Sequence, residues 1–287
     1  MSAIKTVGIV GTGVIGASWT ALFLAHGLQV LPDLKKLGLA SNASLDNYIS
    51  VGASLKDHYA ELDLVQENAT ERVDLKTKLI AEINTGTRPE VIIASSSSGL
   101  PSSKFIGECR QNPGRVLIGH PFNPPHLMPL VEVVPNPQAA KENVDAAVAF
   151  YKSLGKNAVV INQEILGFAA NRLQAVLCTE AYSLVSRGIM SAKDLDLCMT
   201  SSLGPRWALT GPLMSTAMGG GGGTDGFRHL LEHLGPASKV WLEDMKQHAF
   251  TYDKDDLDAL STSVGKELQG KDVKALEAKR DSKLASH

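Results

Sequence analysis

The stretch Lys5–Gly16, which reads KTVGIVGTGVIG, decides the fold expected for this chain. Its first half, Lys5–Val10, is mostly apolar and predicts a buried strand. A helical pattern then runs from Ala17 to His26, and Gly27 would end that helix. A glycine-rich turn between a buried strand and a helix is typical of a nucleotide-binding α/β fold.

Each glycine of this G-x-G-x-x-G motif has its own physical role. Gly11 allows the tight turn after the strand, Gly13 lets the backbone approach a pyrophosphate, and Gly16 lets the helix pack closely on the strand. The N–H groups at the helix start, around Val14 and Ile15, would stabilise the phosphate charge. Because the motif lies directly between strand and helix, it predicts a dinucleotide site.

Such a site has an acid about 20 residues after the glycines, where it binds the ribose hydroxyls. Asp33 stands at about that distance. It follows Pro32, however, which cannot donate the backbone N–H that a central strand needs. Spacing alone leaves two readings of Asp33 open: a ribose ligand, or a loop residue that caps a short helix.

The rest of the chain divides into a strand-rich part and a helical part. Later apolar runs are Leu28–Leu31, Leu62–Val65, Val91–Ala94, Val116–Ile118, Leu130–Val134 and Val159–Ile161. Most are separated by helical or loop segments, which predicts a doubly wound α/β sheet of the Rossmann type. Beyond Asn162, apolar residues recur at helical spacing. We therefore expect a nucleotide-binding domain over 1–163 and a smaller all-helical domain over 164–287.

Composition excludes several classes of protein. A net charge of −2 and a pI near 6.4 give no sign of nucleic-acid or membrane-surface binding. Cys109, Cys178 and Cys198 lack metal or disulfide spacing, which indicates a reducing compartment. No apolar run is long enough to span a membrane, and no signal peptide precedes the first strand. We expect a cytoplasmic protein that binds no metal.

A histidine and a glutamate form the second informative feature. His120 lies at the end of one apolar run, and Glu132 lies twelve residues later inside the next. An imidazole needs a fixed acceptor on one nitrogen if the other is to take a proton, and a buried glutamate can provide it. Alone, the pair is weak evidence, because such residues are more often a core histidine and a strand-end acid. Beside a nucleotide site, it suggests a dehydrogenase.

Further polar residues keep alternative explanations at this stage. Ser95–Ser98 follows the Val91–Ala94 run, where hydroxyls can face a ligand crevice, although a polar turn explains any single serine. Asn171 could cap a helix, bridge the domains or bind substrate. Arg206 could bind an acidic group of a substrate through a charge-assisted fork, or have an ordinary surface role.

Taken together, the motifs resemble the 3-hydroxyacyl-CoA dehydrogenase family, most closely its lambda-crystallin branch, which includes L-gulonate 3-dehydrogenase. The order and spacing of the matching segments are specific, and they extend over most of the chain. These segments are the glycine motif, Ser95–Ser98, His120–Pro125, Leu130–Glu132, Gly167-Phe168 with Asn171–Leu173, Asp194–Asp196, and Gly204–Ala208 with Gly211-Pro212.

The resemblance implies a role for each candidate residue. It makes His120 the catalytic base, oriented by Glu132, and places Ser98 and Asn171 at the reacting oxygen. The residues implied near an NAD cofactor are Gly11, Gly13, Val14, Ile15, Gly16, Asp33, Glu71, Lys76 and Asn123. Without the resemblance, Glu71 and Lys76 would be read as solvated helix charges.

One segment departs from the family pattern. The family has a long helical excursion after its ribose-binding acid, whereas only 34–61 separates Asp33 from the next strand here. A block is therefore missing relative to the family, in the part that supports the adenosine half of the cofactor site.

The sequence thus predicts an NAD-dependent oxidoreductase that oxidises the 3-hydroxyl of a short, L-gulonate-like hydroxy acid or of a 3-hydroxyacyl thioester. A free acid is preferred, because the shortened segment leaves less surface for coenzyme A and Arg206 could hold a carboxylate. We also expect a homodimer formed through the helical domain. The alternatives are a carnitine-type 3-dehydrogenase, a non-catalytic crystallin-like protein and a cofactor-impaired homologue.

Overall fold

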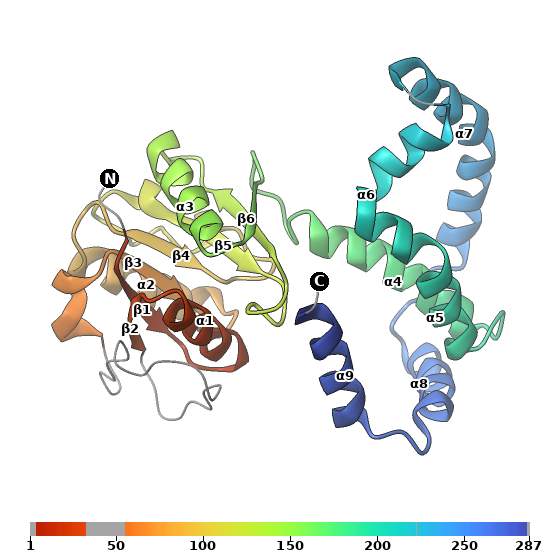
Figure 1. Cartoon of the computed structure of the whole chain (residues 1–287), viewed down its shortest axis with the longest axis horizontal. Coiled ribbons are helices and arrows are strands. Elements are labelled where there is room, and N and C mark those ends of the chain that lie inside the picture. The colour runs from red at the N-terminus through yellow and green to blue at the C-terminus, as the bar shows by residue number, and fades with distance from the viewer. Residues whose placement is uncertain (1–3, 33–54, 222, 286–287) are drawn as a thin grey trace. The chain divides into compact units, whose positions relative to one another are not determined.

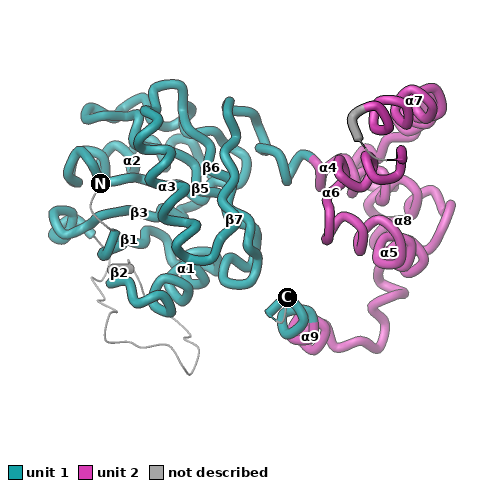
Figure 2. Tube along the Cα trace, turned by 45° about the horizontal axis from the view of Figure 1, so that its top comes forward, with its two compact units in different colours: residues 1–172, 280–287 teal, residues 173–279 magenta. Residues whose placement is uncertain are grey.

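The computed structural model describes residues 4–32, 55–221 and 223–285 (Figure 1). Two compact units are distinguished, Met1–Arg172 with Arg280–His287, and Leu173–Lys279 (Figure 2). The sequence-based boundary between residues 163 and 164 stays a prediction. Asp33 lies outside the described residues.

A seven-stranded sheet, in the order β2-β1-β3-β4-β5-β6-β7, forms the centre of the described part of the first unit. The strands are β1 (Thr6–Val10), β2 (Gln29–Pro32), β3 (Leu64–Glu67), β4 (Ile92–Ser95), β5 (Val116–Pro121), β6 (Leu130–Pro135) and β7 (Asn157–Val160). Neighbouring strands are parallel except for β5 and β6, which are antiparallel. Every strand overlaps an apolar run that the sequence analysis singled out, and the doubly wound α/β fold is confirmed.

The position of β2 explains how a proline can end one of these strands. β2 is the first strand in the sheet order, and Pro32 pairs in register with Ile9 of β1. Proline is tolerated on an edge strand, because its missing N–H can fall on the side that needs no ladder bond. The objection that Pro32 raises against a strand leading to Asp33 therefore does not apply.

Helices cover both faces of the sheet. Helices α1 (Val14–Ala25) and α3 (Lys141–Ser153) bury Phe23 and Tyr151 against Val7, Ile9 and other residues of one face. Helix α2 (Val73–Gly86) buries Ile80 and Ile83 against the other face. Three short 3₁₀ segments complete the described elements of this unit: Lys56–Glu61, Ser102–Lys104 and Pro113–Arg115.

Helices alone build the described part of the second unit. They are α4 (Ala170–Ser186), which starts in the first unit, α5 (Ala192–Ser201), α6 (Leu203–Gly219), α7 (Gly223–Gln247), α8 (Lys254–Leu268) and α9 (Val273–Ala285), whose residues from Arg280 onward belong to the first unit. Helix α6 is kinked at Gly211, whose φ of 70° is not helical, and Pro212 follows it. The helical character of this part of the chain is confirmed. None of the described helices has the length and apolar character needed to cross a membrane.

The glycine motif forms the turn from β1 to α1. Gly11 has a φ of +80°, and a Cβ there would lie 2.7 Å from the Asn68 backbone. At Gly16 a Cβ would lie 2.0 Å from the Gly11 carbonyl oxygen, so the helix start packs directly on the turn. A Cβ at Gly13 would meet nothing within 4 Å. Two of the glycines are thus needed by the fold itself, whereas Gly13 leaves open space.

Gly16→Ala should destabilise the protein by about 1–3 kcal/mol, because the new methyl group must displace the Gly11 carbonyl. Gly13→Ala is the matched control and should stay within about 1 kcal/mol of the parent, since the methyl group enters open space. Urea denaturation midpoints of the two variants provide the measurement. Equal midpoints would contradict the close packing at Gly16.

Candidate active site

The antiparallel pairing of β5 and β6 brings the predicted histidine and glutamate together. His120 and Glu132 are directly opposite in the ladder, so their side chains share one face of the sheet. The His120 Nδ1 and Glu132 Oε2 atoms are 2.8 Å apart. Both side chains are buried, and the rings of Phe122 and Phe168 pack beside the imidazole with centroids 5.5 and 5.6 Å away.

The second carboxylate oxygen of Glu132 binds the start of helix α4. Oε1 accepts hydrogen bonds from the backbone N–H groups of Ala169 and Ala170, each at 3.0 Å. Burial would raise the pKa of Glu132, but hydrogen bonds from His120 and from these two N–H groups hold it below its usual value. An ionised Glu132 favours the imidazole tautomer that carries its proton on Nδ1.

The remaining ring nitrogen of His120 is available for chemistry. Within residues 4–32, 55–221 and 223–285, no group forms a hydrogen bond with His120 Nε2, and the His120 side chain is 6% exposed. In the Nδ1–H tautomer, Nε2 holds the lone pair. The arrangement can therefore take a proton from a group placed beside Nε2.

Ser98 and Asn171 contact each other close to the start of α4. The Asn171 amide Nδ2 donates to the Ser98 carbonyl oxygen at 2.6 Å. Asn171 directly follows Ala170, which is bound to Glu132, so the helix start lies between the His–Glu pair and the Ser98 turn. Ser98 is exposed, and none of the described residues hydrogen-bonds to its hydroxyl. This hydroxyl is therefore free to contact a ligand.

The three preceding serines, 95–97, are occupied by the protein itself. Ser95 donates to Glu67, Ser96 donates to Asn68, and Ser97 donates to Glu71. For these three hydroxyls, the polar-turn explanation that the sequence left open fits the contacts.

Lys76 is not the solvated helix charge that its sequence position suggests. It is fully buried, and its Nζ lies 2.8 Å from each carboxylate oxygen of Glu67. The same Nζ also donates to the Ala69 carbonyl at 3.1 Å and lies 3.4 Å from the Ser95 hydroxyl. The solvated reading is wrong because the first turn of α2 packs over the end of β3. Sequence reasoning missed Glu67, whose signal was an acid two residues after the buried Leu62–Val65 run.

The other predicted residues lie in different places. Glu71 precedes α2, and its carboxylate binds the turn after β4. Asn123 is exposed just after β5. Arg206 is exposed on α6 of the second unit, so its predicted contact with substrate stays a prediction. The described residues contain no group of three or more His, Cys, Asp or Glu that could hold a metal ion.

The turn from β1 to α1 fits the phosphates of a dinucleotide. Gly13 is the N-cap of α1 and forms no side-chain hydrogen bond, which leaves the first-turn N–H groups to an incoming anion. Val14 is 72% exposed at this helix start, and the space around Gly13 is open. The residues present could thus hold the pyrophosphate group at this turn.

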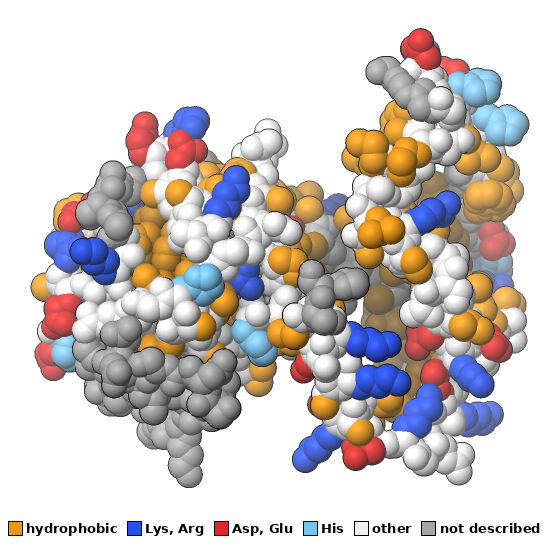
Figure 3. Space-filling view, viewed as in Figure 1, with side chains coloured by type: hydrophobic (Ala, Val, Ile, Leu, Met, Phe, Trp, Pro, Cys, Tyr) orange, Lys and Arg blue, Asp and Glu red, His pale blue; other side chains and the backbone are white. Residues whose placement is uncertain are grey.

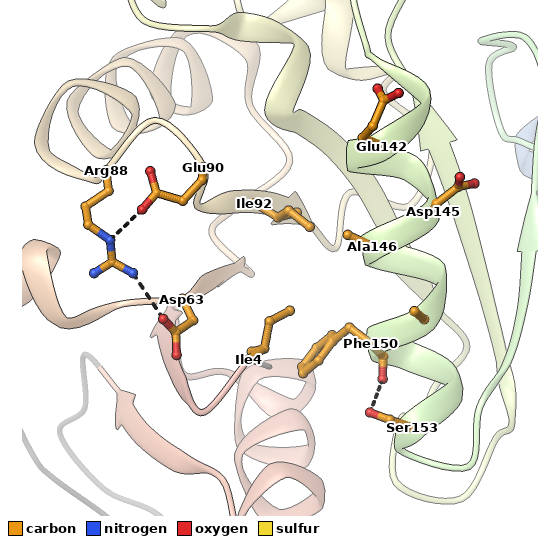
Figure 4. Close-up of a pocket in the computed structure, with 11 residues that line it drawn as sticks. Ile4, Asp63, Arg88, Glu90, Ile92, Glu142, Asp145, Ala146, Phe150 and Ser153 are labelled. Atoms are coloured by element: carbon orange, nitrogen blue, oxygen red, sulfur yellow. Dashed lines mark hydrogen bonds and ion pairs between the residues drawn. The ribbon is translucent and has the colours of Figure 1, made fainter. Parts of the chain in front are cut away.

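A cavity of about 820 Å³ lies away from these residues (Figure 4). Its lining includes Asp63, Arg88 and Glu90, which precede β3 and β4, and residues of α3 such as Phe150. Arg88 pairs with both Asp63, at 3.0 Å, and Glu90, at 2.9 Å. The cavity is therefore at the amino ends of the parallel strands, whereas the candidate site is at their carboxyl ends, where α/β sheets bind ligands.

A nucleotide turn beside a histidine–glutamate pair on a doubly wound sheet indicates a dehydrogenase, and comparison with known proteins defines which one. The family models for the NAD binding domain and the C-terminal domain of 3-hydroxyacyl-CoA dehydrogenase match residues 33–165 and 167–252. A 3-hydroxyacyl-CoA dehydrogenase from Gibberella moniliformis is 49% identical over 285 residues, with 92% of this chain and 88% of that protein covered. The chain belongs to the 3-hydroxyacyl-CoA dehydrogenase family, and NAD is its cofactor.

Two further proteins are similar over almost the whole chain. An L-carnitine dehydrogenase from Streptomyces coelicolor is 38% identical, with 97% of this chain and 92% of that protein covered. The solved structure of an NAD⁺-dependent 5-formyl-3-hydroxy-2-methylpyridine 4-carboxylic acid 5-dehydrogenase has a TM-score of 0.76 and 24% identity, covering 99% of this chain and 97% of that one. The similarity to this solved structure supports the fold alone.

The lowered pKa of Glu132 leads to a prediction for acid stability. Its pKa is lower folded than unfolded, so its contribution is present above the unfolded pKa and is lost as pH falls through the folded pKa. Glu132→Gln should cost about 1–3 kcal/mol near pH 7, because donors around the buried carboxylate lose an acceptor. The difference from the parent should shrink in acid, below about pH 4. Urea midpoints at both pH values test this; a difference independent of pH would contradict it.

Proposed function

We propose that this protein oxidises the 3-hydroxyl group of a short 3-hydroxy acid with NAD as the oxidant. The observation that carries the proposal is the His120–Glu132 pair, in which Glu132 occupies Nδ1 and leaves Nε2 open at the carboxyl edge of the sheet. Membership of a family of NAD-dependent dehydrogenases supports the same chemistry.

In the proposed mechanism, His120 Nε2 accepts the proton of the substrate hydroxyl. Glu132 holds the imidazole in the required tautomer and stabilises the imidazolium that forms. The Ser98 hydroxyl and Asn171 amide hold the reacting oxygen. General-base assistance of this kind contributes roughly 10²- to 10⁴-fold to the rate. NAD, held at the Gly11–Gly16 turn, supplies the hydride acceptor when bound.

The substrate class is the finer part of the proposal. A free acid is favoured, since the segment after Asp33 is short and Arg206 offers a guanidinium for a carboxylate. The 38% identical relative is named for L-carnitine, which is itself a free 3-hydroxy acid, so a carnitine-type substrate stands beside an L-gulonate-like one. The 49% identical relative is named for a 3-hydroxyacyl-CoA, which keeps the thioester as the alternative. Assignment to the lambda-crystallin branch also stays a prediction.

We also propose a homodimer formed through the helical unit. Large apolar side chains are exposed along α6 and α7, where Figure 3 shows hydrophobic side chains gathered. On α6, Leu209 is 85% and Leu213 is 74% exposed, and on α7 Val240 is 68% and Trp241 is 61% exposed. Apolar surface of this kind marks an interaction site. The cytoplasmic location proposed from cysteine usage is compatible with such an assembly.

His120→Gln should lower the turnover rate by at least about 10²-fold, because Gln keeps the approximate shape of the side chain and cannot accept the proton. NAD affinity should stay nearly unchanged, since the glycine turn is untouched. Steady-state NADH formation and calorimetric NAD titration provide the two measurements. Turnover within a few-fold of the parent would remove His120 from the mechanism.

Cofactor titration separates the enzyme from its non-catalytic and cofactor-impaired alternatives. NAD should bind in preference to NADP, because Asp33 would repel a 2′-phosphate, and binding should be weak because the segment after Asp33 is short. Calorimetry with both cofactors should precede assays with L-gulonate, L-carnitine and 3-hydroxybutyryl-CoA. Tight NAD binding that Asp33→Ala abolishes would show that the short segment costs little. Binding that appears only after the missing length is restored would support the impaired homologue.

A further inference from the structure

Asn68 holds the end of β1 at the point where the Gly11–Gly16 turn begins. The carbonyl of Val10, the last residue of β1, accepts hydrogen bonds from the Asn68 backbone N–H at 2.7 Å and from the Asn68 side-chain Nδ2 at 3.2 Å. The Asn68 backbone also packs against the turn, since a Cβ at Gly11 would lie 2.7 Å from it. A shift of Asn68 would therefore move the turn.

The hydrogen bonds of Asn68 fix the orientation of its amide. Its Nδ2 donates to the carbonyls of Val10 and Gln66, at 3.2 and 3.0 Å. Because carbonyl oxygens only accept, Nδ2 must face these two groups and Oδ1 must face the other way. The Ser96 hydroxyl lies 2.7 Å from Oδ1, so Ser96 is the donor that holds the amide in this orientation.

The Ser96 hydroxyl is fully used by the protein. Its oxygen accepts from the indole Nε1 of Trp19 at 3.1 Å and from the amide Nε2 of Gln66 at 2.8 Å. A serine hydroxyl has one proton and two lone pairs, so these two donors and Asn68 account for all of its capacity. Trp19 and Gln66 are fully buried, on α1 and β3. Ser96 thus connects the sheet and α1 to the residue that holds the turn.

We propose that Ser96 and Asn68 are positioning residues that hold the Gly11–Gly16 turn in the shape that binds the pyrophosphate of NAD. Their effect is indirect, because the Ser96 hydroxyl and the Asn68 Nδ2 group are bound within the protein. The inference rests on the part of the proposed function that holds NAD at this turn. It does not depend on the substrate or on His120.

Calorimetric NAD titration without substrate tests the inference. Ser96→Ala should weaken NAD binding by about 10-fold, because the Asn68 amide loses the donor that orients it. Tyr151→Phe is the matched control, since it deletes another hydroxyl of the same polar group, one that donates to Gln66 Oε1 at 2.7 Å. It leaves the bond between Ser96 and Asn68 intact, so NAD binding should stay within about 2-fold of the parent.

A double-mutant cycle separates positioning of the turn from a general contribution to folding. In an Asn68→Ala background, Ser96→Ala should cost no more than about 2-fold in NAD affinity, since the group that Ser96 orients is already absent. Equal losses in both backgrounds, or an equal loss in Tyr151→Phe, would overturn the inference. Ser96→Cys keeps the shape with a weaker donor and should give an intermediate loss, which provides the test if Ser96→Ala does not fold.

Amide hydrogen exchange tests the same contact without cofactor or activity. The N–H of Asn68, which donates to Val10, should exchange faster in Ser96→Ala than in the parent, and at the parental rate in Tyr151→Phe. Unchanged exchange in Ser96→Ala would show that the hydroxyl does not hold the turn. If the parent binds no NAD, the proposed function fails, and the exchange result alone decides whether Ser96 and Asn68 hold the turn.

Discussion

One buried carboxylate, that of Glu132, fixes the geometry on which the candidate site depends. A buried charge is costly unless donors surround it, and Glu132 receives three, one from His120 and two from the start of α4. Because both sets of donors share one group, the imidazole and the helix start cannot be placed independently. Phe168, which immediately precedes Ala169, is fully buried in the core and packs beside the His120 imidazole.

Two more acids at the carboxyl edge of the sheet, Glu67 and Glu71, likewise accept hydrogen bonds from neighbouring segments. Glu67 ends β3 and holds Lys76 and Ser95, so that α2 is tied to two adjacent strands. Glu71 fills the turn after β4. Each acid accepts hydrogen bonds from backbone or hydroxyl groups of a loop, and loops at this edge are the ones that meet a ligand in a doubly wound sheet. These carboxylates therefore hold the loops at this edge of the sheet in place.

The sequence predicted the features that depend on strong local patterns. Apolar runs located all of the described strands, and the glycine spacing predicted that the helix packs closely at Gly16. The order of the strands could not be predicted from the sequence, because it is a tertiary property. The sequence analysis therefore assumed that Pro32 would lie in a central strand, whereas β2 is the first strand of the sheet.

The burial of charged side chains also could not be predicted from the sequence. Lys76 has the spacing of a surface residue, and only the packing of α2 over β3 turns it toward Glu67. The pairing of His120 with Glu132 was accessible because two adjacent apolar runs each ended in or contained one polar residue. The Glu132 contact with α4 was not, since Ala169 and Ala170 contribute only backbone N–H groups, which no side-chain pattern reveals.

The central claim is that Glu132 fixes the proton of neutral His120 on Nδ1 and leaves Nε2 as the acceptor. Nitrogen-15 NMR of the histidine rings measures this directly, because protonated and unprotonated ring nitrogens have distinct chemical shifts, and His120→Gln assigns the signal. The account predicts a neutral form protonated at Nδ1, with that preference weakened in Glu132→Gln. A neutral His120 protonated at Nε2 would contradict it.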